Sequence, residues 1–301
     1  LPVISSPMDT VTETEMLMTL DKLGCLGVLH RYNTIGEQCA MAGFAQTEGR
    51  PLAAAIGATG DYAARANALV DQGVNILCID IAHGHHKFME TAIKKVKDQH
   101  GDRVHIMAGN VATLEAFDAL ASWGADSIRV GIGGGSICST RIVTGHGLPT
   151  LQSVLDCSRT TYDTKIIADG GIKTTGDMVK ALAAGADFVM VGSMLAGTQE
   201  TPGEVFVDAS GEKHKKYRGM ASSSAQRSWR GKSSTPEGVA TVVPYKGSVD
   251  SIIQDIAGGI RSGLSYTGVR SIKELQSRAK FVLQSGAAQL ESNTHILWRH
   301  K

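Results

Sequence analysis

The sequence lacks any apolar run of about 18 residues, the length needed to cross a membrane, and it shows no signal sequence. It also lacks long blocks of one charge sign, because 30 Lys and Arg are balanced by 29 Asp and Glu, for a formal net charge of +1. Proteins that bind nucleic acid or a membrane surface usually carry a basic patch or stripe. The sequence therefore predicts no nucleic-acid partner and no membrane partner.

Paired cysteine spacings are absent as well. The five cysteines are odd in number and show neither the spacing of a disulfide framework nor that of a zinc site. Scattered unpaired cysteines are typical of a reducing compartment. We therefore expect a cytoplasmic protein.

What the sequence does contain is a regular alternation of short apolar runs and segments with helical periodicity. The segments 61–72 and 113–123, for example, each end at a glycine that can cap a helix. Strand, helix, glycine and strand again is the βαβ cycle. Eight cycles in about 200 residues favour an α/β fold, a (β/α)8 TIM barrel, and we expect residues 1–301 to form one barrel domain. The eight runs are 3–4, 26–29, 52–56, 76–80, 104–108, 127–130, 165–169 and 188–191.

One interval between neighbouring apolar runs is longer than the others. Ser127 and Lys165, where the sixth and seventh runs begin, lie 38 residues apart, whereas other neighbouring runs begin 23 to 28 residues apart. The extra length is the segment 131–147, GIGGGSICSTRIVTGHG, in which four glycines precede Cys138. Glycine lets a backbone approach a ligand closely, and such a turn can hold a phosphate or a cation. Most cysteines are small buried hydrophobes, but this position favours a nucleophile on a catalytic cysteine loop.

Polar residues follow the carboxyl ends of several runs, where the loops of a barrel build the active site. The glycine-bearing ends 169–171 and 192–193 follow the seventh and eighth runs, where barrels commonly bind phosphate through loop amides and a helix N-terminus. The other candidates at strand ends are Asp9, His30, Asp80, His83, Asn110 and Cys138.

The chain after the eighth run changes in composition. Residues 205–217 have the pattern of a hairpin, and 221–236 are serine-rich and poor in large aliphatic residues, with Trp229 as the one candidate anchor. This composition favours a mobile flap, with a passive linker as the alternative. We therefore treat 205–247 as a hairpin and flap, and expect 248–261 to be the eighth helix and the last 25 residues to be a tail.

Seven motifs together resemble the IMP dehydrogenase/GMP reductase family. Each is weak alone, but they run in family order from residue 3 to about residue 275. The family fold is a (β/α)8 barrel, which agrees with the eight runs. The motifs are SSPMDTVT (5–12), MAGNV (107–111), GIGGGSICSTR (131–141), ADGG (168–171), VGS (191–193), YRGM (217–220), and EG (237–238) with PYKG (244–247).

The resemblance implies covalent chemistry on a purine nucleotide. Cys138 would attack C2 of the purine and form a thioimidate, and Thr140 and Glu237 would relay a proton to or from the group at C2. The implied substrate contacts are Ser136, Gly171, Gly192, Ser193 and Tyr217 for the phosphate, Asp169 for the ribose, Met220 and Glu237 for the base, and Ser6, Met8, Gly170 and Gly219 as further binding residues.

The resemblance also implies a nicotinamide cofactor, a potassium ion and, as for other family members, a homotetramer. The proline that the family usually has in the potassium-binding turn is Gly134 here, and this departure bears on the ion site. The implied residues are Asp80, Asn110 and Arg129 for the cofactor, and the carbonyl groups of Gly133, Gly135 and Cys138 for potassium (K+).

The family has two branches that run opposite chemistry through the same thioimidate. A dehydrogenase oxidises IMP with NAD and then activates water with an Arg-Tyr pair on its flap, but here Arg227 and Arg230 are followed by serine and glycine. A reductase expels ammonia from GMP, uses NADPH and needs no such base, which suits a short flap. The pair 144–145 (TG) favours this branch too. Only about 20 residues separate His30 from Pro51, too few for the two CBS modules, each a domain of its own, that most dehydrogenases insert there.

Three features favour the dehydrogenase instead, namely the AHGH segment 82–85, Arg218 and the PEG segment 236–238. We expect the reductase, acting on GMP with NADPH, and keep IMP dehydrogenase with NAD as the alternative. A third possibility is a non-catalytic barrel that binds purine nucleotides. Such a barrel would have no use for Cys138 or Thr140.

Overall fold

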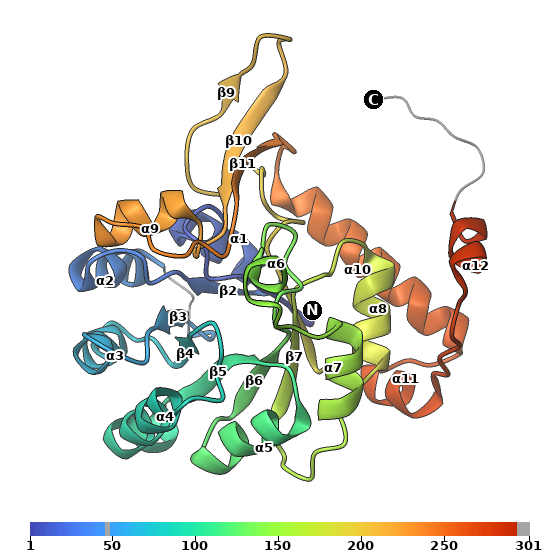
Figure 1. Ribbon diagram of the computed structural model, residues 1–301, viewed down its shortest axis with the longest axis horizontal. Helices are drawn as coiled ribbons and strands as arrows, with labels where there is room; N and C mark the ends of the chain where they lie inside the picture. The colour runs from blue at the N-terminus through green and yellow to red at the C-terminus, as the bar shows by residue number, and fades with distance from the viewer. Residues whose placement is uncertain (46–48, 294–301) are drawn as a thin grey trace.

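The computed structural model describes residues 1–45 and 49–293 and shows a closed barrel of eight parallel strands (Figure 1). Neighbouring strands pair in sequence order, and β1 closes the ring by pairing with β8. The expected α/β class and (β/α)8 TIM-barrel fold are therefore confirmed. The strands are β1 (Val3–Ser5), β2 (Leu26–Leu29), β3 (Ala53–Ile56), β4 (Ile76–Asp80), β5 (His105–Val111), β6 (Ser127–Val130), β7 (Lys165–Asp169) and β8 (Phe188–Val191).

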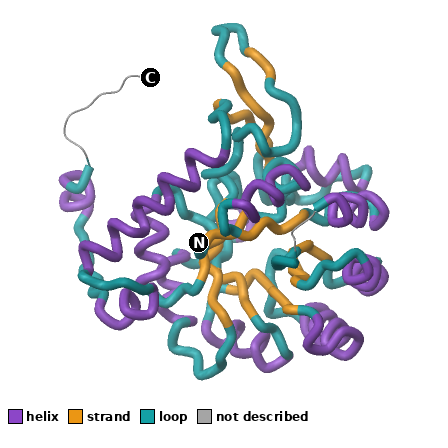
Figure 2. Tube along the Cα trace, turned by 180° about the vertical axis from the view of Figure 1, so that it is seen from behind, coloured by secondary structure: helices purple, strands orange, loops and turns teal. Residues whose placement is uncertain are grey.

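Helices surround the barrel on its outside (Figures 1 and 2). Within the described residues, no helix is both long and apolar enough to span a membrane. The helices that cover the barrel are α1 (Thr14–Lys22), α2 (Ile35–Phe44), α3 (Tyr62–Asp71), α4 (Lys87–His100), α5 (Leu114–Trp123), α7 (Thr150–Cys157), α8 (Thr175–Ala183) and α10 (Val249–Thr267), and a short 3-10 turn at Gly101–Arg103 follows α4.

Local sequence signals fix where these helices begin and end. Thr34 and Glu37 form a reciprocal capping box at the start of α2. Thr113 caps α5, and Gly124 ends it in the left-handed conformation with φ of +109°. Because losing such a cap costs about 0.5–2 kcal/mol, short-range chemistry sets these boundaries.

The core has two layers that make the barrel a rigid support for its loops. Ile4, Val28, Met107 and Met190 are among the side chains that pack inside the barrel. A larger layer fills the space between strands and helices, and Phe117 is the bulkiest of its fully buried side chains. Burying one such side chain stabilises the fold by about 1.5–3 kcal/mol. The loops at the carboxyl ends of the strands are therefore held in fixed positions.

A three-stranded antiparallel sheet projects from the barrel after β8 (Figures 1 and 2). Its central strand is β10 (Lys213–Arg218), which pairs with β9 (Phe206–Val207) on one side and with β11 (Ala240–Pro244) on the other. Since β11 lies close after Glu237, this sheet connects the hairpin to the residue expected in the proton relay.

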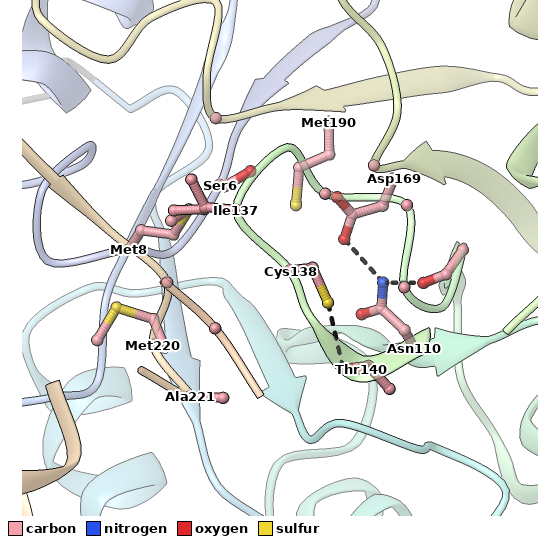
Figure 3. Close-up of a pocket in the computed structure, with 18 of the residues that line it drawn as sticks. Ser6, Met8, Asn110, Ile137, Cys138, Thr140, Asp169, Met190, Met220 and Ala221 are labelled. Atoms are coloured by element: carbon pink, nitrogen blue, oxygen red, sulfur yellow. Dashed lines mark hydrogen bonds between the residues drawn. The ribbon is translucent and has the colours of Figure 1, made fainter. Parts of the chain in front are cut away.

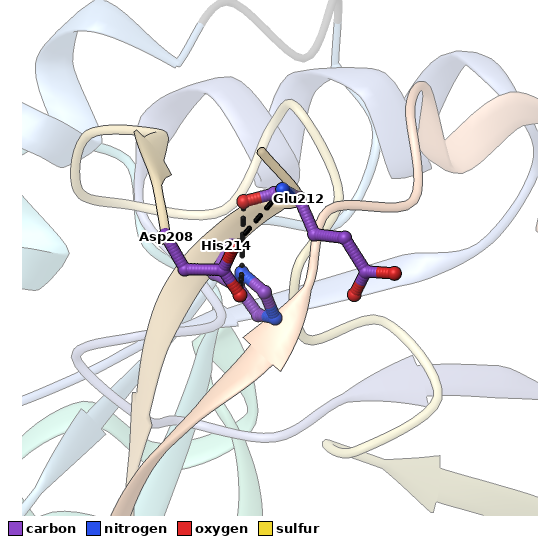
Figure 4. A group of neighbouring side chains, drawn as sticks. All are labelled: Asp208, Glu212 and His214. Carbon is purple, nitrogen blue, oxygen red and sulfur yellow. Dashed lines mark hydrogen bonds and ion pairs between the residues drawn. The ribbon is translucent and has the colours of Figure 1, made fainter. Parts of the chain in front are cut away.

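Polar side chains hold the turn between β9 and β10 (Figure 4). Asp208 Oδ1 accepts hydrogen bonds from the backbone N–H groups of Ser210 at 2.8 Å and Glu212 at 3.0 Å. His214 Nδ1 lies 3.5 Å from Asp208 Oδ2. These contacts form an Asx-type turn that stabilises the tip of the hairpin.

The segment expected to be a flap contains helix α9 (Ser223–Arg230). Ser222 caps it by accepting a hydrogen bond from Ala225 N at 3.2 Å. Trp229 contacts Tyr32 edge to face, with ring centroids 5.5 Å apart, and so acts as the anchor. The composition of the segment did not predict this helix, because serine favours caps and turns over helix interiors.

The carboxyl-terminal region holds more helix than expected. α10 continues beyond residue 261, and α11 (Ile272–Arg278) and α12 (Gly286–Glu291) follow it. The expected tail thus contains α12, a mostly exposed helix, while residues 294–301 lie outside the described part of the chain. Gln276 Nε2 donates to the carbonyl of Ala186 at 3.1 Å, which ties α11 to the barrel.

Candidate active site

A cavity of about 300 Å³ opens at the carboxyl ends of the barrel strands (Figure 3). Its lining comes from the loops after β1, β2 and β4 to β8, and from residues that precede α9 and β11. The structure brings all the residues of the expected catalytic, substrate, cofactor and ion sites to this one lining. They are Cys138, Thr140, Glu237, Ser6, Met8, Ser136, Asp169, Gly170, Gly171, Gly192, Ser193, Tyr217, Gly219, Met220, Asp80, Asn110, Arg129, Gly133 and Gly135.

Gly131 explains how the cysteine loop can begin where it does. Its φ is +144°, and a Cβ at this position would lie 1.9 Å from the carbonyl oxygen of Asp169. Only glycine allows the loops after β6 and β7 to approach so closely. This contact places the cysteine loop directly against the Asp169 loop, so that residues from both can face one ligand.

Cys138, Thr140 and Glu237 form one hydrogen-bonded chain. Cys138 Sγ donates to Thr140 Oγ1 at 3.2 Å, and the Thr140 hydroxyl donates to Glu237 Oε2 at 2.9 Å. Ser139 N donates to the carbonyl of Glu237 at 2.9 Å, which fixes the two segments side by side. A thiol, a hydroxyl and a carboxylate in this order can move a proton beside the sulfur.

The expected cofactor residues and Asp169 form a single charged network. Arg129 Nη1 donates to Asp80 Oδ1 at 2.6 Å, and its Nη2 donates to Asp169 Oδ2 at 2.9 Å. Asn110 Nδ2 donates to the same Asp169 oxygen at 2.8 Å (Figure 3). Burial alone would raise the pKa of Asp80, but Arg129 and Arg31 outweigh it and hold that pKa below its ordinary value. The guanidinium of Arg129 therefore joins Asp80, an expected cofactor residue, to Asp169, the expected ribose residue.

Sequence reasoning missed Arg31 and Tyr32, which follow β2 and line the cavity. Arg31 Nη2 donates to the carbonyl of Asp80 at 3.1 Å, and its guanidinium lies 4.9 Å from the centre of the Tyr32 ring and 5.8 Å from that of Trp229. Burial raises the pKa of Tyr32 to about 12, so this side chain is a neutral phenol. A signal was available, since both residues directly follow His30 at a strand end.

Backbone N–H groups without acceptors lie beside the loop after β8. The N–H groups of Ser193 and Met194 donate to no acceptor among the described residues. A Cβ on Gly192 would lie 3.4 Å from Tyr217 Oη, so this hydroxyl faces the same turn. Burial raises the pKa of Tyr217 although the nearby Ser136 hydroxyl lowers it. Free N–H donors beside a neutral hydroxyl are the chemistry that binds a phosphate.

Three residues at strand ends do not reach the cavity lining. Asp9 is engaged by Arg218, whose Nε lies 3.1 Å from Asp9 Oδ2. His30 is buried, with its Nε2 3.1 Å from Glu13 Oε1. His83 is exposed on the loop before α4. These three candidates therefore lie outside the cavity lining, and any role for them in the site stays a prediction.

The carbonyl groups expected to bind potassium are partly available. Those of Gly133 and Cys138 accept no hydrogen bond from the described residues, whereas that of Gly135 accepts one from Cys138 N at 3.1 Å. The side chain of Arg141 covers the turn, since a Cβ on Gly133 would lie 2.6 Å from Arg141 Cγ. Backbone carbonyls are suitable ligands for this cation, so the donor set fits potassium, and its binding stays a prediction.

Known proteins match this chain over most of its length. The IMP dehydrogenase / GMP reductase domain matches residues 1–295. An inosine-5'-monophosphate dehydrogenase from Nitrosopumilus maritimus is 43% identical over 263 residues, which are 82% of this chain and 55% of that protein. A GMP reductase from Leishmania major is 48% identical over 257 residues, 81% of this chain and 52% of that protein. The chain spans about half the length of these relatives.

Solved structures from both branches have the same fold. A GMP reductase from Trypanosoma brucei, in complex with guanosine 5'-monophosphate, has a TM-score of 0.92 and 31% identity, covering 99% of this chain and 91% of that one. An inosine 5' monophosphate dehydrogenase from Legionella pneumophila has a TM-score of 0.86 and 50% identity, covering 95% and 88%. Relatives of both names are similarly close, which leaves the branch open. From the cavity, the cysteine loop and these matches together, this chain belongs to the IMP dehydrogenase / GMP reductase family.

Proposed function

We propose that this chain is an NAD(P)-dependent oxidoreductase, a GMP reductase that converts GMP to IMP and ammonia with NADPH. The observation that carries the proposal is the Cys138–Thr140–Glu237 chain in a cavity whose lining contains no residue of α9. A reductase needs a nucleophile and a proton donor for the departing amino group. A dehydrogenase needs, in addition, a base that activates water.

The three residues of the relay have complementary roles. The Cys138 thiolate attacks C2 of the purine and forms the C–S bond, which divides one difficult substitution into two easier steps. The proton of the Cys138 thiol passes through the Thr140 hydroxyl to Glu237 and returns along the same path to the 2-amino group, so that the C–N bond breaks and ammonia leaves. When bound, NADPH supplies a hydride to C2. The C–S bond then breaks, Cys138 is regenerated and IMP is released.

Free polar atoms in the lining suit the nucleotide and the cofactor. Asp169 Oδ1 accepts no hydrogen bond from the described residues, so it can accept those of the ribose hydroxyls. Asn110 Oδ1 is equally free and can accept one from a nicotinamide carboxamide. The N–H groups of Ser193 and Met194 are suited to the phosphate. These donors and acceptors support one purine nucleotide and one dinucleotide in adjoining positions.

The position of the flap arginines favours the reductase. Neither Arg227 nor Arg230 lines the cavity, and the guanidinium of Arg230 instead lies 5.3 Å from the ring centre of Trp229. In addition, α2 follows β2 directly, and only about 20 residues separate His30 from Pro51, too few to hold an inserted domain. Among the described residues, therefore, no arginine of α9 reaches the cavity lining, which supports a reductase over a dehydrogenase.

One observation favours IMP dehydrogenase with NAD as the second candidate. Arg31 and Tyr32 form an Arg-Tyr pair in the lining, although they come from the loop after β2. Burial alone would lower the pKa of Arg31, but its neighbours, including Asp80, raise it above its ordinary value. A guanidinium that stays protonated is a poor base for water. The pair therefore supports substrate or cofactor binding better than hydrolysis.

We also propose a homotetramer that acts in the cytoplasm. The tetramer rests on the family resemblance, and the compartment rests on the five cysteines, all of which are free thiols. Sedimentation equilibrium at micromolar concentration measures the assembly. A monomer or dimer across that range would contradict the tetramer.

The proposed activity is tested by absorbance at 340 nm in two parallel assays. One contains the protein with GMP and NADPH, and the other contains it with IMP, NAD and potassium. We expect a falling signal and release of ammonia in the first assay and no change in the second. A rising signal in the second assay would instead establish the dehydrogenase, with Arg31, Arg227 and Arg230 as the bases to examine.

A further inference from the structure

Lys246 binds the turn after β8 from outside the cavity. Its Nζ donates to the carbonyl of Ser193 at 2.9 Å and to that of Met194 at 3.0 Å. Lys246 itself is absent from the cavity lining, whereas Ser193 is part of it. The ammonium therefore lies behind the turn that carries the free N–H groups.

The backbone beside Lys246 is joined to the same turn. Lys246 N donates to the carbonyl of Gly197 at 2.9 Å, and Gln199 N donates to the carbonyl of Gly247 at 2.8 Å. Lys215 of β10, which is only 2% exposed, binds the backbone that follows this turn. Its Nζ donates to the carbonyl groups of Thr198, Gln199 and Thr201.

The hydrogen bond from Lys246 to the carbonyl of Ser193 fixes the direction in which the turn presents the N–H of Met194. In a trans peptide the C=O and the following N–H point in opposite directions. Because the carbonyl of Ser193 faces Lys246, the N–H of Met194 faces away from it. This N–H and that of Ser193 have no acceptor among the described residues. Lys246 therefore holds the turn so that the N–H of Met194 stays free to donate to a ligand.

Lys246 also carries a charge that no carboxylate cancels. The cations of the lining, Arg31 and Arg129, form ion pairs with Asp80, and Arg129 pairs with Asp169 as well. Lys246, by contrast, is an exposed residue that forms no ion pair among the described residues, and partial desolvation lowers its pKa without an opposing carboxylate. Its positive charge is thus free to attract an anion at the turn.

We propose that Lys246 is a positioning residue for the substrate phosphate. It orients the peptide between Ser193 and Met194 and places a positive charge without a carboxylate partner behind it, so that the site prefers a nucleoside monophosphate over the corresponding nucleoside. This inference rests on the proposed function, which puts the phosphate of a purine nucleotide at this turn. The ligand chemistry it assigns is a phosphate monoester dianion.

The test compares binding of GMP and guanosine by isothermal titration calorimetry in four proteins. These are the wild type, Lys246→Met, which keeps a long unbranched side chain without the charge, Lys246→Arg, which keeps the charge, and Lys216→Met as the control. Lys216 is an exposed lysine of β10 with no side-chain partner among the described residues. Thermal unfolding of each protein shows whether the variants fold.

We expect Lys246→Met to bind GMP about 10- to 100-fold more weakly, the range for losing hydrogen bonds to a charged group, and to bind guanosine as before. In turnover, KM for GMP should rise more than kcat falls. Lys246→Arg should restore most of the preference, and Lys216→Met should keep all of it. Equal weakening for GMP and guanosine, or an unchanged preference, would overturn the role of Lys246. A wild type that binds guanosine as tightly as GMP would instead contradict the phosphate subsite of the proposed function.

Discussion

At the scale of single residues, environment separates Cys138 from the other cysteines. Burial raises the pKa of Cys78 to about 11 and that of Cys157 to about 12, so both stay as thiols that pack in the core. Cys138 is instead partly exposed in the cavity lining and donates a hydrogen bond to the hydroxyl of Thr140. Because the thiolate is the nucleophilic form, only this position combines access to a substrate with a proton acceptor.

Replacing Cys138 by alanine should abolish turnover and leave nucleotide binding nearly intact, because the covalent step is lost and the phosphate and ribose contacts remain. NADPH oxidation at 340 nm and calorimetric binding of GMP measure the two effects. Cys39→Ala is the matched control, since Cys39 is also partly exposed but lies on α2. Residual turnover above one hundredth of the wild-type rate in Cys138→Ala would argue against covalent catalysis.

Glu237→Gln and Thr140→Val should each lower kcat by about 10²- to 10⁴-fold, the range for a lost general acid or base. Because the two side chains act in one chain, the double variant should be little slower than the worse single variant. Steady-state rates with GMP and NADPH give all three values. Losses that multiply would show that the two residues act separately.

At the scale of elements, two contacts hold helix α9 against the barrel. Arg218 Nη1 donates to Ser224 Oγ at 2.9 Å and to Ser228 Oγ at 3.1 Å, while its other side engages Asp9. Ser224 and Ser228 are four residues apart and so share one helix face. The second contact is Trp229 on Tyr32. The flap in this structure is therefore a docked helix beside the cavity.

Trp229→Ala should loosen α9 without unfolding the barrel. An edge-to-face aromatic pair contributes about 0.5–1.5 kcal/mol beyond its buried area, so amide hydrogen exchange in α9 should become roughly 2- to 12-fold faster, with the global melting temperature nearly unchanged. Trp229→Phe should retain most of the protection. Unchanged exchange in Trp229→Ala would mean that the Arg218 contacts alone hold the helix.

Periodic elements could be predicted from the sequence, but contacts between distant segments could not. The barrel strands and the Thr113 and Gly124 ends of α5 follow from local pattern and cap chemistry. The position of Arg31 after a strand end could have marked it as a candidate, but its contact with Asp80, 49 residues away in the sequence, follows only from the fold. The cavity residues that belong to the motifs could be predicted because the motifs resemble a family. Helix α9 could not be predicted, because its serine-rich composition is typical of caps and turns.

At the scale of the whole molecule, the residues that stabilise the barrel lie apart from those of the proposed active site. The large apolar core fixes the strands, and the charged and polar groups of the proposed site lie on loops at one end. A few polar groups are nevertheless buried away from the site. His100, at the end of α4, is 8% exposed, and neither ring nitrogen has a hydrogen-bond partner among the described residues. Such a group affects folding more than catalysis.

The barrel should lose stability as pH falls below about 6.5, the ordinary pKa of histidine, and His100 should account for part of this loss. Burial lowers the pKa of His100, so the unfolded chain binds the proton more tightly than the folded one. The stabilising contribution is therefore complete above the unfolded pKa and disappears as pH falls toward the folded one. Melting temperatures of wild type, His100→Leu and the exposed control His85→Leu at pH 8 and pH 5 test this. A pH dependence in His100→Leu as steep as in the wild type would rule His100 out.

The most direct test of the proposed function follows the hydrogen that reaches C2. GMP is incubated with the protein and with NADPH deuterated at both C4 positions, and the product is examined by mass spectrometry and proton NMR while ammonia is measured. We expect IMP that carries one deuterium at C2, with one ammonia released per IMP. IMP without deuterium at C2, or IMP formed without matching ammonia, would contradict hydride transfer from NADPH to C2 with loss of the amino group.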